Sequence, residues 1–350
     1  MIRQACYLLA AAICAFTASV TAASTAHYTI TDLGPAEAVA INASGQVLLQ
    51  GDHGSYSAVW LPNKPNAIEG AVWDIGQYTP EEYDPEYGLV TESFALNDLG
   101  DIVGMSGSGW RYKGSPSAEP FRTRIGKQLT KQSLLYGGAG FIPHAINNRG
   151  LVVGEIRGTG NCHAAKRLFT GKIVSLGKLG GDKGYACQAL GVNDRGTIVG
   201  WSDDHAWVIT GNHMRDLGDG TANAINNRGV ICGASHKKAC VWIGGCARIL
   251  DSSDHSGQPD MSAYCLRYWS FSEANDINDR GQAVGSVGMK SAAFAALWQN
   301  HKQVDLNTLI KDRAWHLNSA VGINEKGQII GVGTYRGKTH SFLLTSVKPR

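Results

Sequence analysis

The hexapeptide AINNRG at residues 145–150 recurs unchanged at residues 224–229, and near-copies occur in five further places. In every copy at least one apolar residue directly precedes an Asn, and a Gly follows three positions later. The key asparagines are Asn42, Asn97, Asn147, Asn193, Asn226, Asn278 and Asn324. Their spacings are 55, 50, 46, 33, 52 and 46 residues, and units of about 40 to 50 residues are typical of propeller blades and helical arrays. The chain therefore contains seven repeats.

Each repeat predicts four short strands. The N-x-x-G segment fits a type I turn whose last residue is left-handed, which is a common connection of a β-hairpin. Short runs of Val and Ile follow and suit the second strand. A third strand is indicated by segments such as HAWV from His205 and HSFLL from His340, and a fourth by VWDIG from Val72 and MRDLG from Met214. Helical periodicity is absent almost everywhere, so the repeat is predicted to be all-β.

The two ends of the chain predict how the repeats close. The last repeat has its hairpin at residues 322–333 and its third strand at residues 341–345, but no fourth strand follows. The matching fourth-strand pattern, YTITDLG, lies at residues 28–34, before the first hairpin. A ring closed in this way hides its strand edges, whereas a straight solenoid needs polar caps instead. We therefore predict an all-β, seven-bladed β-propeller of four-stranded blades, closed by the N-terminal strand completing the last blade.

Residues 1–23 differ from the rest of the chain. Arg3 precedes the apolar run YLLAAAICAF, and small residues follow. This pattern predicts a secretory signal peptide that is cleaved near Ala22 or Ala23. Residues 24–350 then form a single propeller domain that is secreted or periplasmic. No other stretch is long and apolar enough for a membrane span in the mature chain.

Composition and charge fit a soluble exported protein. The 350 residues are 43% apolar and include 44 Gly, which suits many turns. Removing the signal peptide leaves 31 Lys and Arg against 29 Asp and Glu, a net charge of about +2. The basic residues are not clustered in the sequence, so we expect no nucleic-acid partner.

The mature chain retains six cysteines, an even number that permits disulfides in an exported protein. We predict one pair between Cys162 and Cys187 and another between Cys246 and Cys265. Cys232 occupies a position where other repeats have Val or Ile. It could be a buried thiol or form a bridge to Cys240. No spacing of Cys and His indicates zinc, and we expect no metal and no cofactor.

The repeats also carry recurring histidines and aspartates. The histidines are His163, His205 and His340, and the aspartates of the DLG-like segments are Asp32, Asp74, Asp216 and Asp305. Because each of the histidines lies in a different repeat, a structural role is favoured over a shared metal site, and the aspartates are interpreted as turn-stabilising side chains.

Together these phrases resemble the HAF-repeat family of probable extracellular bacterial proteins. The resemblance covers residues 28–345 and rests on the AINxxG segments, on HAW at His205, on HSF at His340 and on the DLG-like stretches. The second repeat departs from the pattern, since it has PFRT where HAFLW is expected. The resemblance implies an extracellular location and no particular chemistry.

Three long insertions, residues 77–92, 105–119 and 251–272, are the candidate binding regions, because variable loops on a rigid scaffold often carry function. The aromatic candidates for ligand binding are Tyr78, Tyr83, Tyr87, Trp110, Tyr112, Tyr268 and Trp269. Aromatic rings can stack on sugars while neighbouring carboxylates accept hydrogen bonds from hydroxyl groups. The same loops could equally be solvated segments whose aromatics only fix them to the scaffold.

Two classes of function follow. The favoured one is a non-catalytic binding or scaffold propeller whose partner is a carbohydrate such as a surface glycan, or an extracellular protein. The alternative is a hydrolase or lyase acting on polysaccharide, with candidate residues Glu82, Asp84, Asp254, His255 and His316. No nucleophile elbow or phosphate-binding loop is present, which favours binding. The ligand and the oligomeric state are not indicated by the sequence.

Overall fold

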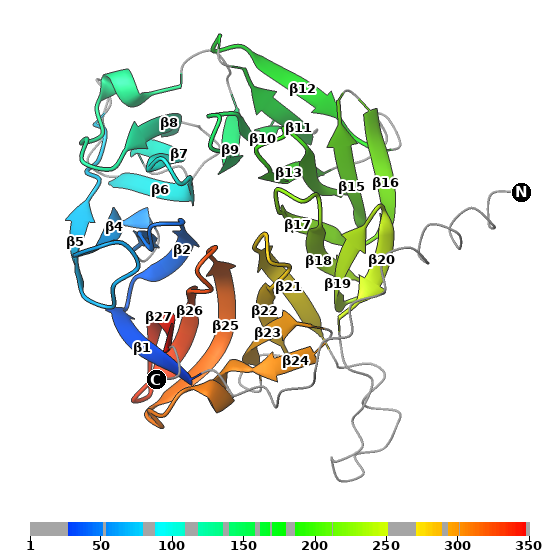
Figure 1. Cartoon of the computed structure of the whole chain (residues 1–350). Coiled ribbons are helices and arrows are strands. Elements are labelled where there is room, and N and C mark those ends of the chain that lie inside the picture. Colours follow the sequence, from blue (N-terminus) through cyan, green and yellow to red (C-terminus); the bar gives the residue numbers. More distant parts are fainter. Residues whose placement is uncertain are drawn as a thin grey trace, which may run out of the picture.

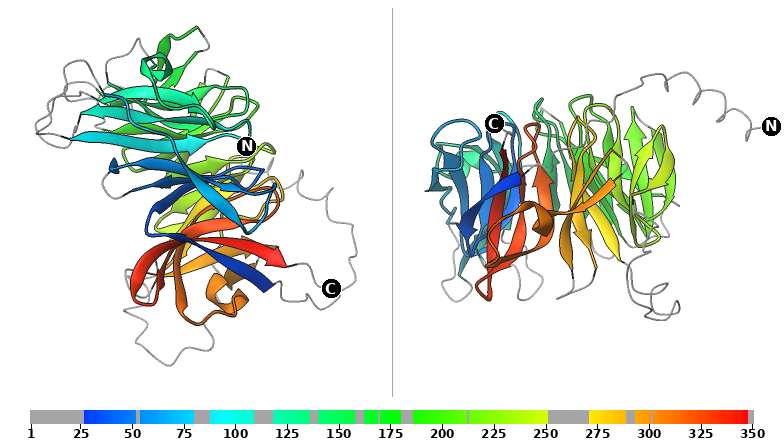
Figure 2. Two further views of the ribbon diagram at one scale, coloured as in Figure 1. Left: turned by 90° about the vertical axis from the view of Figure 1, so that its left-hand side faces the viewer. Right: turned by 60° about the horizontal axis from the view of Figure 1, so that its bottom comes forward.

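The chain folds as a ring of seven antiparallel sheets arranged around a central axis (Figure 1). The computed structural model describes residues 27–51, 54–79, 88–108, 118–135, 140–157, 162–168, 170–179, 186–211, 213–250, 271–288, 293–300 and 302–347. Figure 2 shows the same ring from two further sides, in which the sheets stand next to one another like blades. The predicted seven-bladed β-propeller is confirmed.

In blades 1 to 6 the strands follow one another outward from the centre of the ring in chain order. Blade 1 comprises β2 (Glu37–Ile41), β3 (Val47–Gln50), β4 (Ser57–Pro62) and β5 (Gly70–Asp74), and blade 2 comprises β6 (Leu89–Leu96), β7 (Asp101–Ser108) and β8 (Ala118–Arg124). Blade 3 comprises β9 (Phe141–Ile146), β10 (Val152–Arg157), β11 (Cys162–Arg167) and β12 (Ile173–Gly177), and blade 4 comprises β13 (Cys187–Val192), β14 (Ile198–Ser202), β15 (His205–Thr210) and β16 (His213–Asp219). Blade 5 comprises β17 (Thr221–Ile225), β18 (Ile231–Ser235), β19 (Lys238–Ile243) and β20 (Cys246–Ile249), and blade 6 comprises β21 (Ser272–Ile277), β22 (Ala283–Val287), β23 (Phe294–Gln299) and β24 (Lys302–Asp305).

Blade 7 is built from both ends of the chain. It contains β25 (Trp315–Ile323), β26 (Ile329–Tyr335) and β27 (Lys338–Val347), and β1 (His27–Gly34) supplies its fourth strand. β1 pairs antiparallel with β27 from His27 opposite Val347 to Gly34 opposite Ser341. The predicted exchange of the N-terminal strand is therefore present.

Blade 2 departs from the predicted four strands. In its described part it has three, and the chain after β8 instead forms a 3-10 helix, η3 (Lys131–Ser133). Leu134 then makes a single β-bridge to Phe121, and the N–H of Leu135 donates to the carbonyl of Pro120 over 2.7 Å. Leu129 and Leu134 are buried against the cores of blades 1 and 2. Apolar packing thus covers the edge of β8 where a strand was expected.

The repeated Asn organises each hairpin turn. In the turn of blade 5, Asn226 Oδ1 accepts the N–H of Arg228 over 3.0 Å and that of Val230 over 2.9 Å. Gly229 completes the turn at a φ of +84°, a conformation that L residues rarely adopt. The other six turns have the same two bonds to Asn Oδ1, at their own residues. The predicted turn type and the left-handed Gly are confirmed.

The same asparagines join the blades to one another. Each uses Nδ2 to donate to the backbone carbonyl of the corresponding Asn in the next blade, over 2.8 to 3.2 Å. The chain of bonds runs from Asn42 to Asn97, Asn147, Asn193, Asn226, Asn278, Asn324 and back to Asn42. All seven side chains are buried. The repeated Asn is thus both a turn residue and a link in a closed inter-blade ring.

A second ring of bonds involves the residue after each Asn. Its side chain accepts the N–H of the equivalent residue in the preceding blade, as Asp98 does from Ala43 over 2.7 Å. Five more links of this kind follow. The series stops at Ala43, because the alanine side chain cannot accept a hydrogen bond from the preceding blade. There Asn66, from the loop between β4 and β5, donates to the Ala43 carbonyl and accepts from Asn324 Nδ2.

The Gly of the second strand explains another part of the repeat. In blade 4 a Cβ added to Gly200 would lie 1.9 Å from the carbonyl oxygen of Gln188 and 2.7 Å from the Trp207 ring. Only Gly therefore allows the first strand and the buried Trp to approach this closely. Trp207, Trp242 and Trp298 are among the largest fully buried side chains, and they fill the spaces between neighbouring blades.

The predicted disulfide between Cys162 and Cys187 is wrong. None of the described cysteines forms a disulfide. The Cys162 thiol donates to Glu155 Oε2 over 2.7 Å, and the Cys187 thiol points to the carbonyl of Gly177. Cys232 and Cys240 form no bridge to each other, and they pack in two different apolar clusters.

The predicted bridge between Cys246 and Cys265 involves one cysteine that lies outside the described residues. Cys246 is an exposed, unpaired thiol at the start of β20, whereas residues 251–270 follow the other end of that strand. Cys265 lies outside the described residues. In the described part of the chain, no helix has the length and apolar character needed to cross a bilayer.

Candidate functional site

The two faces of the ring are built differently. One face, which we call the turn face, carries the seven N-x-x-G turns and the connections from third to fourth strands. The opposite face, the loop face, carries the connections from second to third strands and those between blades. The inter-blade connections range from the single residue 220 to residues 250–271. Variation in loop length therefore concentrates on the loop face, as predicted. An exception on the turn face is the loop of residues 63–69, which covers the seam at Ala43.

Most predicted site residues fall outside the described part of the chain. These are Tyr83, Tyr87, Trp110, Tyr112, Tyr268 and Trp269, and the alternative catalytic candidates Glu82, Asp84, Asp254 and His255. The predicted insertions are also shorter than expected, because residues 89–92 belong to β6 and residues 105–108 to β7.

Two predicted residues are described, and they lie in different blades. Tyr78 precedes β6, packs against the core between blades 1 and 2, and its N–H donates to Ser106 Oγ over 3.1 Å. His316 lies near the start of β25 in blade 7, where its Nε2 is 3.1 Å from the carbonyl oxygen of Ala293. The structure does not bring these two residues together.

A polar cluster that the sequence analysis missed lies between blades 3 and 4, at the loop-face end of their inner strands. Its centre is Glu155 in β10, whose side chain is 1% exposed. Other repeats have Gln50, Met105, Trp201, Ala234, Ser286 and Val332 at this position. A buried carboxylate inside the apolar segment LVVGEIR is the signal that could have identified it, because such a group requires partners.

Glu155 has polar partners on four strands. Arg157 Nε donates to Oε1 over 2.8 Å, while the Cys162 thiol and Gln188 Nε2 donate to Oε2 over 2.7 and 3.0 Å. His144 Nε2 lies 3.7 Å from Oε1, which is within ion-pair range but too long for a hydrogen bond. We call these five residues the Glu155 cluster.

Aromatic rings flank the Glu155 cluster. The Trp201 indole donates from Nε1 to Gln188 Oε1 over 3.2 Å, which holds the amide that bonds to Glu155. The Phe94 ring from blade 2 lies 6.1 Å from the His144 ring, centroid to centroid. Rings from blades 2 and 4 therefore border the cluster on both sides.

The electrostatics fix the protonation states within the cluster. Burial alone would raise the pKa of Glu155, but the contacts with His144, Cys162 and Arg157 outweigh it and lower that pKa to about 2. Burial and the neighbouring Glu155 carboxylate raise the pKa of the Cys162 thiol to about 12. At neutral pH Glu155 is therefore a carboxylate and Cys162 a neutral thiol.

These states limit the chemistry that the cluster can perform. An ionised carboxylate with three hydrogen-bond donors has no proton to give, and a protonated thiol is a poor nucleophile. The side chains of Arg157 and His144 remain 54% and 21% exposed. The arrangement is suited to presenting a held guanidinium and an imidazole to a polar ligand.

The recurring histidines and aspartates form pairs within blades. His205 Nδ1 lies 3.0 Å from Asp216 Oδ2 in blade 4, and His340 Nδ1 lies 2.8 Å from Asp32 Oδ1 in blade 7. Asp216 and Asp32 also accept the N–H of the Gly two residues later. In these two blades, therefore, the His of the third strand and the Asp of the DLG-like segment have a structural role.

In blade 4 this pairing extends to the next blade. His205 Nε2 lies 3.2 Å from Asp219, which in turn lies 3.3 Å from His236 Nε2. Within the described ranges no group of three or more His, Cys, Asp or Glu side chains is arranged to hold a metal ion.

Comparison with solved structures supports the fold. The chain is similar to virginiamycin B lyase from Staphylococcus aureus, with a TM-score of 0.51 and 10% identity over 91% of this chain and 100% of that one. The β-propeller domain of the trilobed protease from Pyrococcus furiosus gives a TM-score of 0.48 and 9% identity, covering 93% and 94% of the two chains. YCF48 bound to D1 peptide gives 0.48 and 10%, covering 92% and 97%.

The likeness to virginiamycin B lyase concerns the architecture alone, because the identity is so low. Neither a protein-family model nor a curated protein sequence matches the chain.

Proposed function

We propose that the protein is an exported, non-catalytic propeller that binds its ligand on the loop face. The observation that carries the proposal is the contrast between the faces. Seven turns of one design form the turn face, while the loops of the opposite face differ in length from blade to blade. A rigid ring that varies on one face is typical of a scaffold that presents a recognition surface there.

The Glu155 cluster supports binding rather than catalysis. Its carboxylate and thiol are held in states that give neither a general acid nor a nucleophile at neutral pH. Arg157, Phe94 and His144 add a guanidinium and two rings around the buried carboxylate. Together these groups suit a hydroxyl-rich or carboxylate-bearing partner, which we propose to be a surface glycan, with another extracellular protein as the second partner class.

Export rests on residues 1–23. The proposal predicts that the protein recovered from outside the cytoplasm begins near residue 23 or 24. N-terminal sequencing of the exported protein tests this, and an intact N-terminus on all exported protein would contradict it.

The binding test is a titration of the exported protein against a panel of bacterial and plant polysaccharides, with both retention and soluble products recorded. We expect retention without products. Tyr83→Ala, Trp269→Ala and Phe94→Ala should weaken retention, whereas Lys302→Ala on the turn face serves as the matched control. Release of shortened sugars would instead support a hydrolase or lyase that uses residues such as Glu82, Asp254 and His255. Absence of both signals would contradict a glycan ligand within the panel.

A further inference from the structure

The turn face carries a cluster of basic side chains whose residues are far apart in the sequence. The second residue after each repeated Asn lies at the tip of its turn. Five of the seven tips are basic and exposed, on five consecutive blades: Arg149, Arg195, Arg228, Arg280 and Lys326. Because these residues are 33 to 52 positions apart in the sequence, they form no basic stripe there. The ring brings them into one arc around the central axis.

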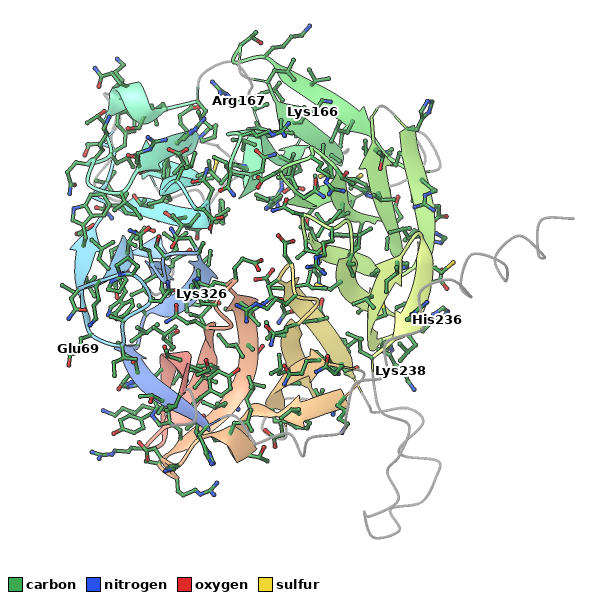
Figure 3. The ribbon with its side chains drawn as sticks, viewed as in Figure 1. Glu69, Lys166, Arg167, His236, Lys238 and Lys326 are labelled. Atoms are coloured by element: carbon green, nitrogen blue, oxygen red, sulfur yellow. The ribbon has the colours of Figure 1, made fainter. Side chains whose placement is uncertain are left out.

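The hydrogen-bond rings show that the basic tips are neighbours. Consecutive turns are joined by the Asn side chains and by the residues that follow them, over 2.7 to 3.2 Å. Figure 3 shows Lys326 close to the centre of the ring, whereas Glu69, His236 and Lys238 lie on its outer parts. The arc therefore surrounds the turn-face end of the central axis.

The acidic side chains of the turns keep their negative charge but are held against the backbone. Asp98, Asp194, Asp279 and Glu325 each use one carboxylate oxygen to accept a backbone N–H of the preceding blade. Arg280 donates to the backbone carbonyl of Glu325. Among the described residues, Arg149, Arg195, Arg228 and Lys326 form no ion pair.

More cations surround the arc on the same face. Lys64 and Lys172 lie in connections between third and fourth strands, Lys127 follows β8, and Lys302 is the first residue of β24; all four are exposed. Glu69 is the exposed acid among these connections in the described ranges. Over the turns and these outer positions together, nine basic side chains stand against the five acids Asp98, Asp194, Asp279, Glu325 and Glu69, so the turn face has a net positive charge.

Exposed apolar side chains occur on the same face. Leu99 occupies the turn tip of blade 2 and is 58% exposed, and Val347, Ile68 and Ile243 are 49%, 44% and 44% exposed. Ile68 lies in the loop of residues 63–69, Ile243 at the end of β19 and Val347 at the end of β27, all at turn-face ends of strands. These four are a majority of the seven large apolar side chains that are strongly exposed in the described chain.

We propose that the turn face docks on an anionic lipid bilayer. Turns of one design place the basic tips at equivalent positions around the ring, which suits a broad surface better than a small ligand. Cations near an anionic bilayer gain electrostatic attraction, and apolar side chains among them can enter the interfacial region. This second surface is separate from the ligand site proposed on the loop face, so either proposal can fail without the other.

The test is co-sedimentation of the exported protein with vesicles of phosphatidylcholine, with and without about one third phosphatidylglycerol. We expect binding to the anionic vesicles only, weakening as salt is raised. The variant Arg149→Gln, Arg195→Gln, Arg228→Gln should bind more weakly by about fivefold per cation, or about a hundredfold in total. Leu99→Ser should also weaken binding.

The matched control is Lys237→Gln, Lys238→Gln, Lys338→Gln, which removes three cations from hairpins on the loop face. It should bind vesicles like the parent. Equal thermal midpoints for both triple variants and the parent would show that folding is unaffected. Equal binding by the two triple variants, or equal binding to neutral and anionic vesicles, would overturn the proposal. So would equally tight binding of a soluble anionic polysaccharide, which would assign the face to a polymer.

Discussion

Asn324 donates a hydrogen bond from Nδ2 to the backbone carbonyl of Asn42 over 3.0 Å, although 282 residues separate them. The bond is the same as the six that join consecutive blades along the chain. The seam between the last and first blades is therefore closed at the inner turns as well as by the pairing of β1 with β27. Asn66 reinforces this seam from the loop between β4 and β5.

Asn324→Ala should destabilise the protein, because it removes the seam bond and leaves the backbone groups of a buried turn unsatisfied. Loss of such buried hydrogen bonds costs about 1 to 3 kcal/mol. Urea unfolding measures the change, and Asn63→Ala, at an exposed amide that bonds only to Glu69, is the control. Equal urea midpoints for the two variants would contradict the role of the Asn ring.

Gly229→Val should destabilise the protein through backbone strain alone. An added Cβ would meet nothing within 4 Å, but φ is +84°. An L residue in this region costs about 1 to 2 kcal/mol, and a β-branched one resists it most. Gly229→Asn should lose less stability, since Asn tolerates the left-handed region. Thermal unfolding of the two variants compares them, and a parent-like midpoint for Gly229→Val would refute the turn assignment.

Most of the fold could be predicted from the repeated Asn–Gly segment. The positions of the turns, the strand order and the exchange of the N-terminal strand all follow from local patterns of Asn, Gly and β-branched residues. Blade 2 was mispredicted because its fourth strand is replaced by apolar packing of Leu129 and Leu134, which has no strand-like pattern. β11 and β20 lack the aromatic or DLG-like segments that identified their equivalents.

The candidate sites were harder to predict than the fold, for a physical reason. Glu155, His144 and Gln188 meet across two blades, and no sequence spacing signals such a contact. The basic arc of the turn face has the same origin, because residues from separate repeats become neighbours only when the ring closes. Cys162 and Cys187 were rightly placed near one another, but Glu155 takes the Cys162 thiol as a donor.

Stability should depend on pH through Glu155. Its pKa is lowered from 4.5 to about 2 in the folded protein, so its contribution is present above about pH 4.5 and is lost as the pH falls toward 2. The difference corresponds to about 3 kcal/mol. Glu155→Gln removes this contribution. The gap in unfolding free energy between parent and variant should therefore narrow between pH 4.5 and 2, and a constant gap over that range would contradict the assignment.

The cysteines should behave as thiols in the folded protein. Because burial and Glu155 raise the pKa of Cys162, iodoacetamide should modify it far more slowly than the exposed Cys246. Reducing agent should leave the thermal midpoint unchanged as far as Cys162 and Cys187 are concerned. Peptide mapping by mass spectrometry under non-reducing conditions measures the alkylation, and thermal unfolding with and without reducing agent measures the midpoint. A linked peptide containing Cys162 and Cys187 would contradict the arrangement.

The most direct test of the closed ring is to remove β1 and supply it again. Deleting residues 27–34 from the mature chain leaves β27 without its outer neighbour and removes Tyr28 and Leu33 from two apolar clusters. The account predicts a marked fall in the urea midpoint of the shortened protein, and recovery when a synthetic peptide of residues 27–34 is added. An unchanged midpoint after the deletion would contradict closure of the ring by its N-terminal strand.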